Sequence, residues 1–148
     1  MRIRIKEKER MKITNFNFVN TMNTLNSFGD KKLPQKISYA ITKNLITLQK
    51  EYEVYVKMLN DLYTKYDADI IHDENGERIV DKQGIPELKK EAKEAFFNEL
   101  TEFLNMEIDI DMYLIPDDVF NYDDMSGRYD AMSASDIIML RNILCEQK

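Results

Sequence analysis

The sequence predicts a mainly α-helical protein of the α+β class, with a long antiparallel helix pair, a small β-hairpin and strand element, and a C-terminal helix. Three observations support this fold class. Apolar residues recur with heptad spacing over 41–66, an amphipathic segment covers 86–104, and the pattern changes to two-residue alternation over 106–114. The first two patterns are typical of helices that pack side by side, and the third is typical of a strand with one buried face.

The heptad repeat is the strongest local signal in the chain. Its apolar and aromatic positions alternate in steps of four and three: Ile41, Leu45, Leu48, Tyr52, Tyr55, Leu59, Leu62 and Tyr66. Pro34 precedes the repeat at a position where its fixed φ and missing N–H cost little, so we predict a helix over 35–66. Since a narrow apolar seam needs a partner, we expect it to pack on the 86–104 helix; self-association into a coiled coil is the alternative.

Two shorter helices flank this pair. The first is predicted over 16–27, and Gly29 is expected to end it by adopting φ > 0 without a steric penalty. The last is predicted to start near Ser135, where Ser133 or Ser135 can cap the helix and Asp136 favours its N-terminus.

A β-hairpin is predicted at about 68–84, because Asn75-Gly76 lies between two pairs of apolar residues. A two-residue turn would place Asp73 opposite Arg78. Two short strands are only marginally stable on their own in water, so we expect this hairpin to be exposed.

The length and composition suit one globular domain. The chain has 148 residues, of which 43% are hydrophobic, and this suffices for a core. Residues 1–12 contain six basic and two acidic side chains, a net charge of +4, so the other residues carry −10 to give the total of −6. We therefore expect residues 1–10 to form a basic N-terminal appendage, or to precede a true start at Met11, and residues 11–148 to form a single helical domain.

The charge and the scarcity of cysteine and histidine exclude several classes of protein. A strongly acidic body disfavours direct binding of nucleic acid, because phosphate neutralisation needs clustered Lys and Arg. Cys145 and His72 are the only residues of their types, so we expect neither an internal disulfide nor a conventional zinc site. No apolar stretch approaches the length of about 18 residues that a membrane span needs, and the N-terminus lacks the pattern of a signal peptide. We therefore expect a cytoplasmic protein without membrane contact.

The nearest approach to a metal site is Asp109-x-Asp111 on the predicted strand. Two-residue alternation places both carboxylates and Glu107 on one face, where Mg²⁺ could bind. The glycine-rich turn that holds phosphate in nucleotidyl-transfer sites is missing, and no Gly-x-Ser-x-Gly motif accompanies His72 or Cys145. We therefore expect no catalytic residue, no cofactor and no metal, and an acidic solvated face instead.

The segment 107–130 carries eight carboxylates against Arg128 alone, a net charge of −7, and aromatic residues are interleaved with them. Charge steers a partner and aromatic side chains anchor it, so this composition is typical of a surface that docks on a basic protein. The residues that we predict for partner binding are Asp109, Asp111, Asp117, Asp118, Phe120, Tyr122, Asp123 and Asp124. The alternative interpretation is a solvated face in which Phe120 and the tyrosines pack into the core.

After a short N-terminal helix, four sequence stretches follow one another along the chain: KLPQKISYAITKN, which runs into the long charged helix, DENGE in the hairpin, NELTEFLNMEIDIDMYLIPDDVF, and a final SASDIIMLRNIL. This succession resembles small bacteriophage proteins of unknown function over residues 11–146. The resemblance implies a phage or prophage origin, and hence the cytoplasm of an infected or lysogenic bacterium. It supplies no activity.

These observations lead to one function hypothesis and two alternatives. The leading hypothesis is a non-enzymatic, anti-defence phage protein that binds and inhibits a host protein with a basic surface, such as a nucleic-acid-binding nuclease of the CRISPR type. The first alternative is an oligomeric phage scaffold or structural component that uses the heptad helix. The second is a protein that binds a nucleotide signal or a metal. For the leading hypothesis we expect a monomer or a weak homodimer.

Overall fold

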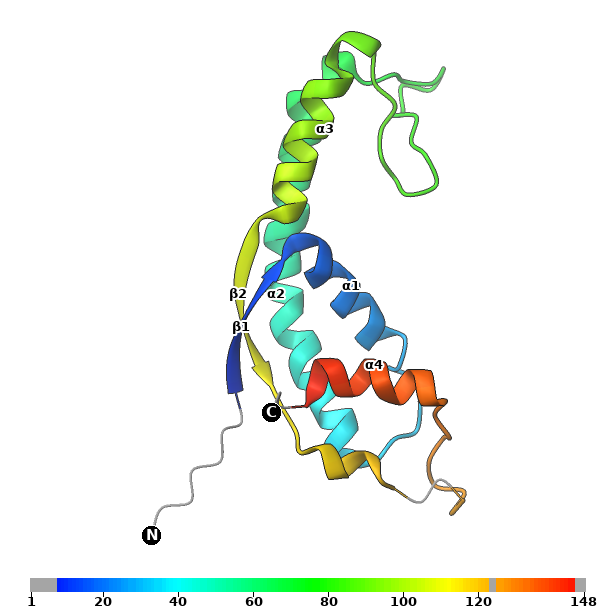
Figure 1. Cartoon of the computed structure of the whole chain (residues 1–148). Helices are drawn as coiled ribbons and strands as arrows, with labels where there is room; N and C mark the ends of the chain where they lie inside the picture. The colour runs from blue at the N-terminus through cyan, green and yellow to red at the C-terminus, as the bar shows by residue number, and fades with distance from the viewer. Residues whose placement is uncertain (1–7, 123–124, 146–148) are drawn as a thin grey trace. The chain divides into compact units, whose positions relative to one another are not determined.

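The computed structural model describes residues 8–122 and 125–145 (Figure 1). In chain order its helices and strands are β1 (Lys8–Thr14), α1 (Asn15–Asn26), α2 (Gln35–Lys65), α3 (Lys90–Asn105), β2 (Glu107–Tyr113) and α4 (Ala134–Leu144), with short 3-10 turns at Asp67–Asp69 and Asp117–Phe120. The predicted fold class is confirmed: 57% of the described residues are helical, and a long α2 is combined with a two-stranded antiparallel sheet. No helix in the described ranges is long and apolar enough to span a bilayer.

The chain divides into two compact units, and the single domain that we expected over 11–148 stays a prediction. Unit 1 comprises the residues up to Glu51 and those from Glu107 onward, and unit 2 comprises Tyr52–Met106. The boundary falls within α2, so the first part of this helix belongs to unit 1 and the second part to unit 2.

The sheet of unit 1 pairs β1 with β2 in antiparallel orientation, with Met11 opposite Ile110. On β2 the side chains of Ile110 and Met112 are buried, while those that alternate with them are exposed or partly exposed. β1 begins at Lys8, so the end of the segment that we expected to be an appendage, 1–10, belongs to the sheet.

Helices α1 and α4 and the first part of α2 form the core of unit 1 together with the sheet. The largest fully buried apolar side chains of this unit are Phe18, Leu25, Ile37, Leu48, Met112, Leu140 and Leu144. A mostly apolar cavity of about 70 Å³ remains among them, lined from both strands and from all three helices.

Helix α1 is capped at its start and ends without a left-handed glycine. The hydroxyl of Thr14 accepts a hydrogen bond from the backbone N–H of Asn17 at 3.2 Å. At the other end Gly29 does not adopt φ > 0, contrary to our expectation; its N–H donates to Asn26 in a further turn. Phe28 is buried just after the helix, so side-chain packing accompanies the change of chain direction.

Helix α4 begins with a capping box, close to the position that we predicted. The backbone N–H of Asp136 donates to the Ser133 hydroxyl at 3.0 Å, and the N–H of Ser133 donates to the Asp136 carboxylate at 3.3 Å. Of the two serines that we proposed as caps, Ser133 is the one used.

In unit 2, the second part of α2 and α3 form the predicted antiparallel helix pair (Figure 1). Tyr55 stacks on Phe103 with 5.3 Å between ring centroids, and Tyr66 meets Phe96 edge-on at 5.4 Å. Residue numbers rise along α2 as they fall along α3, so the two helices run in opposite directions. The buried side chains of this core are Ile70, Leu88, Phe96 and Leu100. The second half of the heptad seam therefore packs within the chain.

Three short segments between the helices pair with one another in a closed triangle. Single antiparallel bridges join them: Ile70 to Leu88, His72 to Arg78, and Val80 to Pro86. The central residues close a ring of N–H donors and carbonyl acceptors at 2.8–2.9 Å: Ile71 to Glu87, Glu87 to Ile79, and Ile79 to Ile71. Because Pro86 and Leu88 belong to this triangle, α3 begins at Lys90 and not at 86 as we predicted.

Two turns of the same design connect the three segments. In each turn an aspartate Oδ1, from Asp73 or Asp81, accepts the N–H groups two and four residues later. Gly76 and Gly84 then adopt φ of +79° and +80°, a conformation that residues with a Cβ rarely take.

The predicted hairpin is present, but its register differs from our expectation by one residue. His72, and not Asp73, lies opposite Arg78, because the side chain of Asp73 is used to hold the turn. We expected the whole of 68–84 to be exposed. Ile70 contradicts this expectation, since it is 3% exposed and belongs to the core of unit 2.

Candidate docking surface of unit 1

The carboxylates predicted on β2 lie on its exposed face, opposite basic residues of β1. In the antiparallel register Asp109 lies opposite Lys12, and Asp111 lies opposite Arg10, whose Nε is 3.7 Å from the carboxylate. The Arg10 and Asp111 side chains are 73% and 57% exposed, so this ion pair is strongly screened by water. Within residues 8–122 and 125–145, no group of three His, Cys, Asp or Glu side chains could hold a metal ion.

Asp117 and Asp118 follow β2 on the short 3-10 turn after Pro116. Asp117 is held by Arg141 of α4, whose Nε lies 2.7 Å from Oδ1 and whose Nη2 donates to Oδ2 at 3.2 Å. Asp118 is exposed. The predicted binding residues Asp123 and Asp124 lie outside the described part of the chain.

Phe120 is buried and cannot be the docking anchor that we predicted, whereas the role of Tyr122 in binding stays a prediction. Phe120 is 5% exposed and belongs to the core of unit 1. The hydroxyl of Tyr122 donates to the backbone carbonyl of Asp130 at 2.8 Å, and its ring meets Tyr129 edge-on at 5.5 Å. Asp130 is held in turn by the backbone of Lys32. The N–H of Lys32 donates to the Asp130 carboxylate, and the N–H of Asp130 donates to the Lys32 carbonyl, each at 2.7 Å. The packing of Phe120 agrees with our alternative interpretation of this segment.

A pocket beside the start of α2 provides an exposed aromatic side chain, that of Tyr39, in place of Phe120. It has a volume of about 370 Å³ and is lined by Gln35, Lys36, Tyr39, Tyr113, Leu114, Ile115 and Pro116. Tyr39 is 47% exposed and meets Tyr113 edge-on with 5.3 Å between centroids. The Nζ of Lys43 lies 5.8 Å from the Tyr39 ring centroid, so a cation also borders this aromatic pair.

The pocket and the acidic residues are adjacent in unit 1. Two-residue alternation puts Tyr113 on the same face of β2 as Asp109 and Asp111. Asp117 and Asp118 directly follow the pocket residue Pro116. We define the acidic-aromatic surface as these four aspartates together with the two pocket tyrosines: Tyr39, Asp109, Asp111, Tyr113, Asp117 and Asp118.

A buried asparagine positions one side of this surface. Asn44 of α2 is 0% exposed; its Nδ2 donates to the carbonyl of Tyr113 at 2.9 Å, and its Oδ1 accepts the N–H of Tyr113 at 2.7 Å. The side-chain amide thus supplies one donor and one acceptor to the backbone of Tyr113, the last residue of β2. A neighbouring strand would supply the same two groups. Sequence reasoning missed Asn44 and Tyr39, because neither is an apolar heptad position and nothing local links them to β2.

The single cysteine has the environment of a core residue. Cys145 is buried at the end of α4, and burial, followed by the nearby Asp117 carboxylate, raises the pKa of its thiol to about 11. The thiol is therefore protonated near neutral pH and is a poor nucleophile there. His72 belongs to unit 2, where its Nε2 lies 3.4 Å from the Asp67 carboxylate.

Comparison with protein families, with curated proteins and with solved structures finds no match for this chain. The resemblance to small bacteriophage proteins therefore stays a prediction from the sequence.

Proposed function

We propose that this chain is a non-enzymatic phage-type protein that binds and inhibits a bacterial host protein through the acidic-aromatic surface of unit 1. The partner has a basic surface of the kind found on nucleic-acid-binding nucleases. One observation carries the proposal: the exposed Tyr39 and the partly buried Tyr113, which meet edge-on, border a pocket of about 370 Å³ beside accessible carboxylates. Aromatic side chains at a pocket are typical anchors of protein interfaces, and carboxylates around them accelerate encounter with a cationic partner.

An oligomeric scaffold built on the heptad seam has less support. In unit 2 the seam residues Leu59, Leu62 and Tyr66 pack against the buried cluster of the same unit. In unit 1 the seam residues Ile41 and Leu48 are buried. A seam whose residues pack inside one chain leaves little apolar surface for a coiled-coil partner.

Affinity capture with matched variants tests the proposal. The bait is the tagged protein, added to a lysate of bacteria, and the captured proteins are quantified by mass spectrometry. The first variant replaces three exposed carboxylates by amides: Asp109→Asn, Asp111→Asn and Asp118→Asn. Asp117 is left unchanged because it pairs with Arg141. The control removes the same charge from unit 2 at exposed positions: Glu87→Gln, Glu91→Gln and Glu94→Gln.

We expect a basic protein that the wild type and the control capture and that the aspartate variant loses. With the purified partner, the aspartate variant should associate about tenfold more slowly at low salt and depend less on salt, because steering acts on the association rate. Tyr39→Ala should instead raise the dissociation rate about thirtyfold. This corresponds to a loss of about 2 kcal/mol in binding free energy, as expected for an anchoring aromatic side chain. The proposal is wrong if the aspartate variant and the control capture the same proteins, or if the captured partner keeps full activity in the complex.

A further inference from the structure

The pocket at the start of α2 has a charge that differs from that of the carboxylates around it. Among the described residues that line it, Lys36 is charged and none is acidic. Lys43 adds a second cation at its border, with Nζ 5.8 Å from the centroid of the Tyr39 ring. Lys36, Tyr39 and Lys43 follow one another in steps of three and four residues along α2, so they lie on one face of the helix. The pocket therefore combines an aromatic wall with two cations.

These two lysines have no counter-charge of their own in the structure. Within residues 8–122 and 125–145, no carboxylate forms an ion pair with Lys36 or Lys43. Helix α2 also contains no acidic residue before Glu51. Lys57 and Lys65, farther along the same helix, are by contrast paired with carboxylates of the chain. An anionic ligand at the pocket would supply the counter-charge that Lys36 and Lys43 lack.

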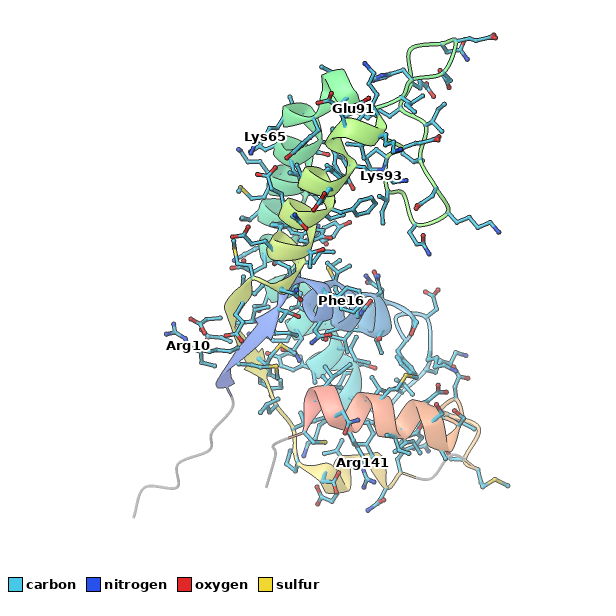
Figure 2. All side chains as sticks on the ribbon, turned by 45° about the horizontal axis from the view of Figure 1, so that its top comes forward. Arg10, Phe16, Lys65, Glu91, Lys93 and Arg141 are labelled. Atoms are coloured by element: carbon cyan, nitrogen blue, oxygen red, sulfur yellow. The ribbon has the colours of Figure 1, made fainter. Side chains whose placement is uncertain are left out.

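The nearby carboxylates do not cancel this positive charge. Asp117 is engaged by Arg141, whose Nε lies 2.7 Å from its Oδ1. Figure 2 shows Arg141 on the side of α4 that faces the Asp117–Phe120 turn. The aspartates of β2 lie opposite basic residues of β1. Among the described residues next to the pocket, Asp118 alone is left against Lys36 and Lys43, so the balance of charge is positive.

The two pocket tyrosines offer a surface on which a planar ring can stack. Tyr39 is 47% exposed, and the partly buried Tyr113 meets it edge-on. The backbone of Tyr113 is held by the buried Asn44, so the aromatic pair is positioned before a ligand arrives. Stacking on an aromatic side chain stabilises any nucleobase, because every base has a π face. Gln35, which also lines the pocket, adds an amide that can donate to or accept from a base or a sugar hydroxyl.

We propose that this pocket binds a nucleoside monophosphate, with the base against Tyr39 and Tyr113 and the phosphate between Lys36 and Lys43. Ligand pockets range from about 300 to about 1,000 Å³. The volume of about 370 Å³ lies at the low end of this range, which favours a mononucleotide over a larger dinucleotide. Lysine binds phosphate as a point charge. A nucleoside lacks the charge and inorganic phosphate lacks the ring, so each makes only part of these contacts.

The inference goes beyond the proposed function. The nucleotide site shares Tyr39 and Tyr113 with the acidic-aromatic surface, but its test requires no host protein. Nucleotide binding and docking on a host protein can therefore fail independently of each other. Since one ring stacks and the cations are accessible to water, we expect a dissociation constant of about 0.1 to 1 mM.

Titration of the ¹⁵N-labelled full chain with AMP, followed by NMR, tests the site. The amide signals of Leu114 and Ile115 at the pocket should shift, whereas that of Leu100 in unit 2 should stay in place. Adenosine and inorganic phosphate, titrated in the same buffer, should each bind about tenfold more weakly than AMP. Added salt should weaken the binding of AMP, because ions screen the attraction between phosphate and lysine.

Single substitutions divide the contributions of ring and charge. Tyr39→Leu should raise the dissociation constant of AMP about tenfold because the stacking ring is lost, and Tyr39→Phe, which keeps the ring, should leave it unchanged. Lys36→Gln should raise it about threefold, as expected for an accessible ion pair. The matched control is Lys50→Gln, the same change of charge at an exposed position two turns beyond Lys43 on α2, which should have no effect. Circular dichroism of every variant checks that the helices remain.

Three results would each overturn the proposal. The first is the absence of any shift at the pocket amides with AMP up to about 10 mM. The second is adenosine that binds as tightly as AMP, because the lysines would then not hold the phosphate. The third is a loss of affinity in Lys50→Gln equal to that in Lys36→Gln, which would indicate attraction to the helix as a whole and not to the pocket.

Discussion

Asn44 shows how one buried polar residue can fix the geometry of a surface. Its amide is fully removed from water and makes both of its described hydrogen bonds to the backbone of Tyr113. Those bonds join α2 to the end of β2, next to the pocket that Tyr39 and Tyr113 border. A buried polar group that is fully paired specifies one arrangement, because any shift leaves donors and acceptors unsatisfied.

We predict that Asn44→Ala lowers the free energy of unfolding by about 3 kcal/mol, because it removes a fully buried amide and takes both partners from the partly buried N–H and carbonyl of Tyr113. Urea denaturation measures the loss. The control is Gln49→Ala, an exposed position of α2 in the same unit, which should change stability by less than about 0.5 kcal/mol. Equal stability of the two variants would show that water or a shifted strand satisfies Tyr113.

At the scale of elements, the three paired segments between α2 and α3 are part of the packing of unit 2. Their ring of three backbone hydrogen bonds closes the triangle, and Ile70 and Leu88, which are bridged to each other, enter the buried cluster with Phe96 and Leu100. The turns themselves remain exposed. The connection between α2 and α3 therefore combines exposed turns with two buried side chains, those of Ile70 and Leu88.

We predict that Ile70→Ala lowers the free energy of unfolding by about 2 to 4 kcal/mol, the usual cost of a cavity at a buried isoleucine. Ile79→Ala is the matched control, since Ile79 belongs to the same triangle but is 37% exposed; it should cost less than half as much. Thermal unfolding of both variants provides the comparison. If Ile70→Ala proved as mild as Ile79→Ala, the triangle would not contribute to the core.

At the scale of the whole molecule, the division into two units predicts separate opening reactions. Unit 1 has its own core of α1, α4, the sheet and the first part of α2, whereas unit 2 has the Ile70, Leu88, Phe96 and Leu100 cluster. Regions with separate cores open locally with their own free energies. The single domain that we expected over 11–148 would open as one.

Hydrogen exchange distinguishes these two descriptions. We predict that Asn44→Ala accelerates exchange of amides in unit 1, such as that of Leu140, more than exchange of amides in unit 2, such as that of Leu100. Ile70→Ala should do the reverse. Equal acceleration in both units by either variant would indicate a single cooperative domain.

The candidate site was predictable only in part, and its carboxylates were the predictable part. Asp109 and Asp111 lie on one exposed strand face because two-residue alternation is a local property of β2. The aromatic residues could not be assigned in the same way. Phe120 and Tyr113 occur in the same acidic segment, yet Phe120 is buried while Tyr113 borders the pocket beside Tyr39 of α2.

The sequence by itself determined the elements whose signals are local. The heptad repeat and Pro34 placed α2 at 35–66, against the observed Gln35–Lys65, and the alternation over 106–114 contains β2. Helix and strand periods and the cap at Ser133 depend on neighbouring residues, so they can be recognised without the fold.

Tertiary structure alone decided the contacts between distant segments. It paired β1 with β2, delayed α3 to Lys90 by drawing 86–88 into the triangle, and turned Phe120 into the core. Each outcome depends on a partner far away in the sequence. The direction of a side chain on an irregular segment is set by which surface covers it, and no local period encodes that surface.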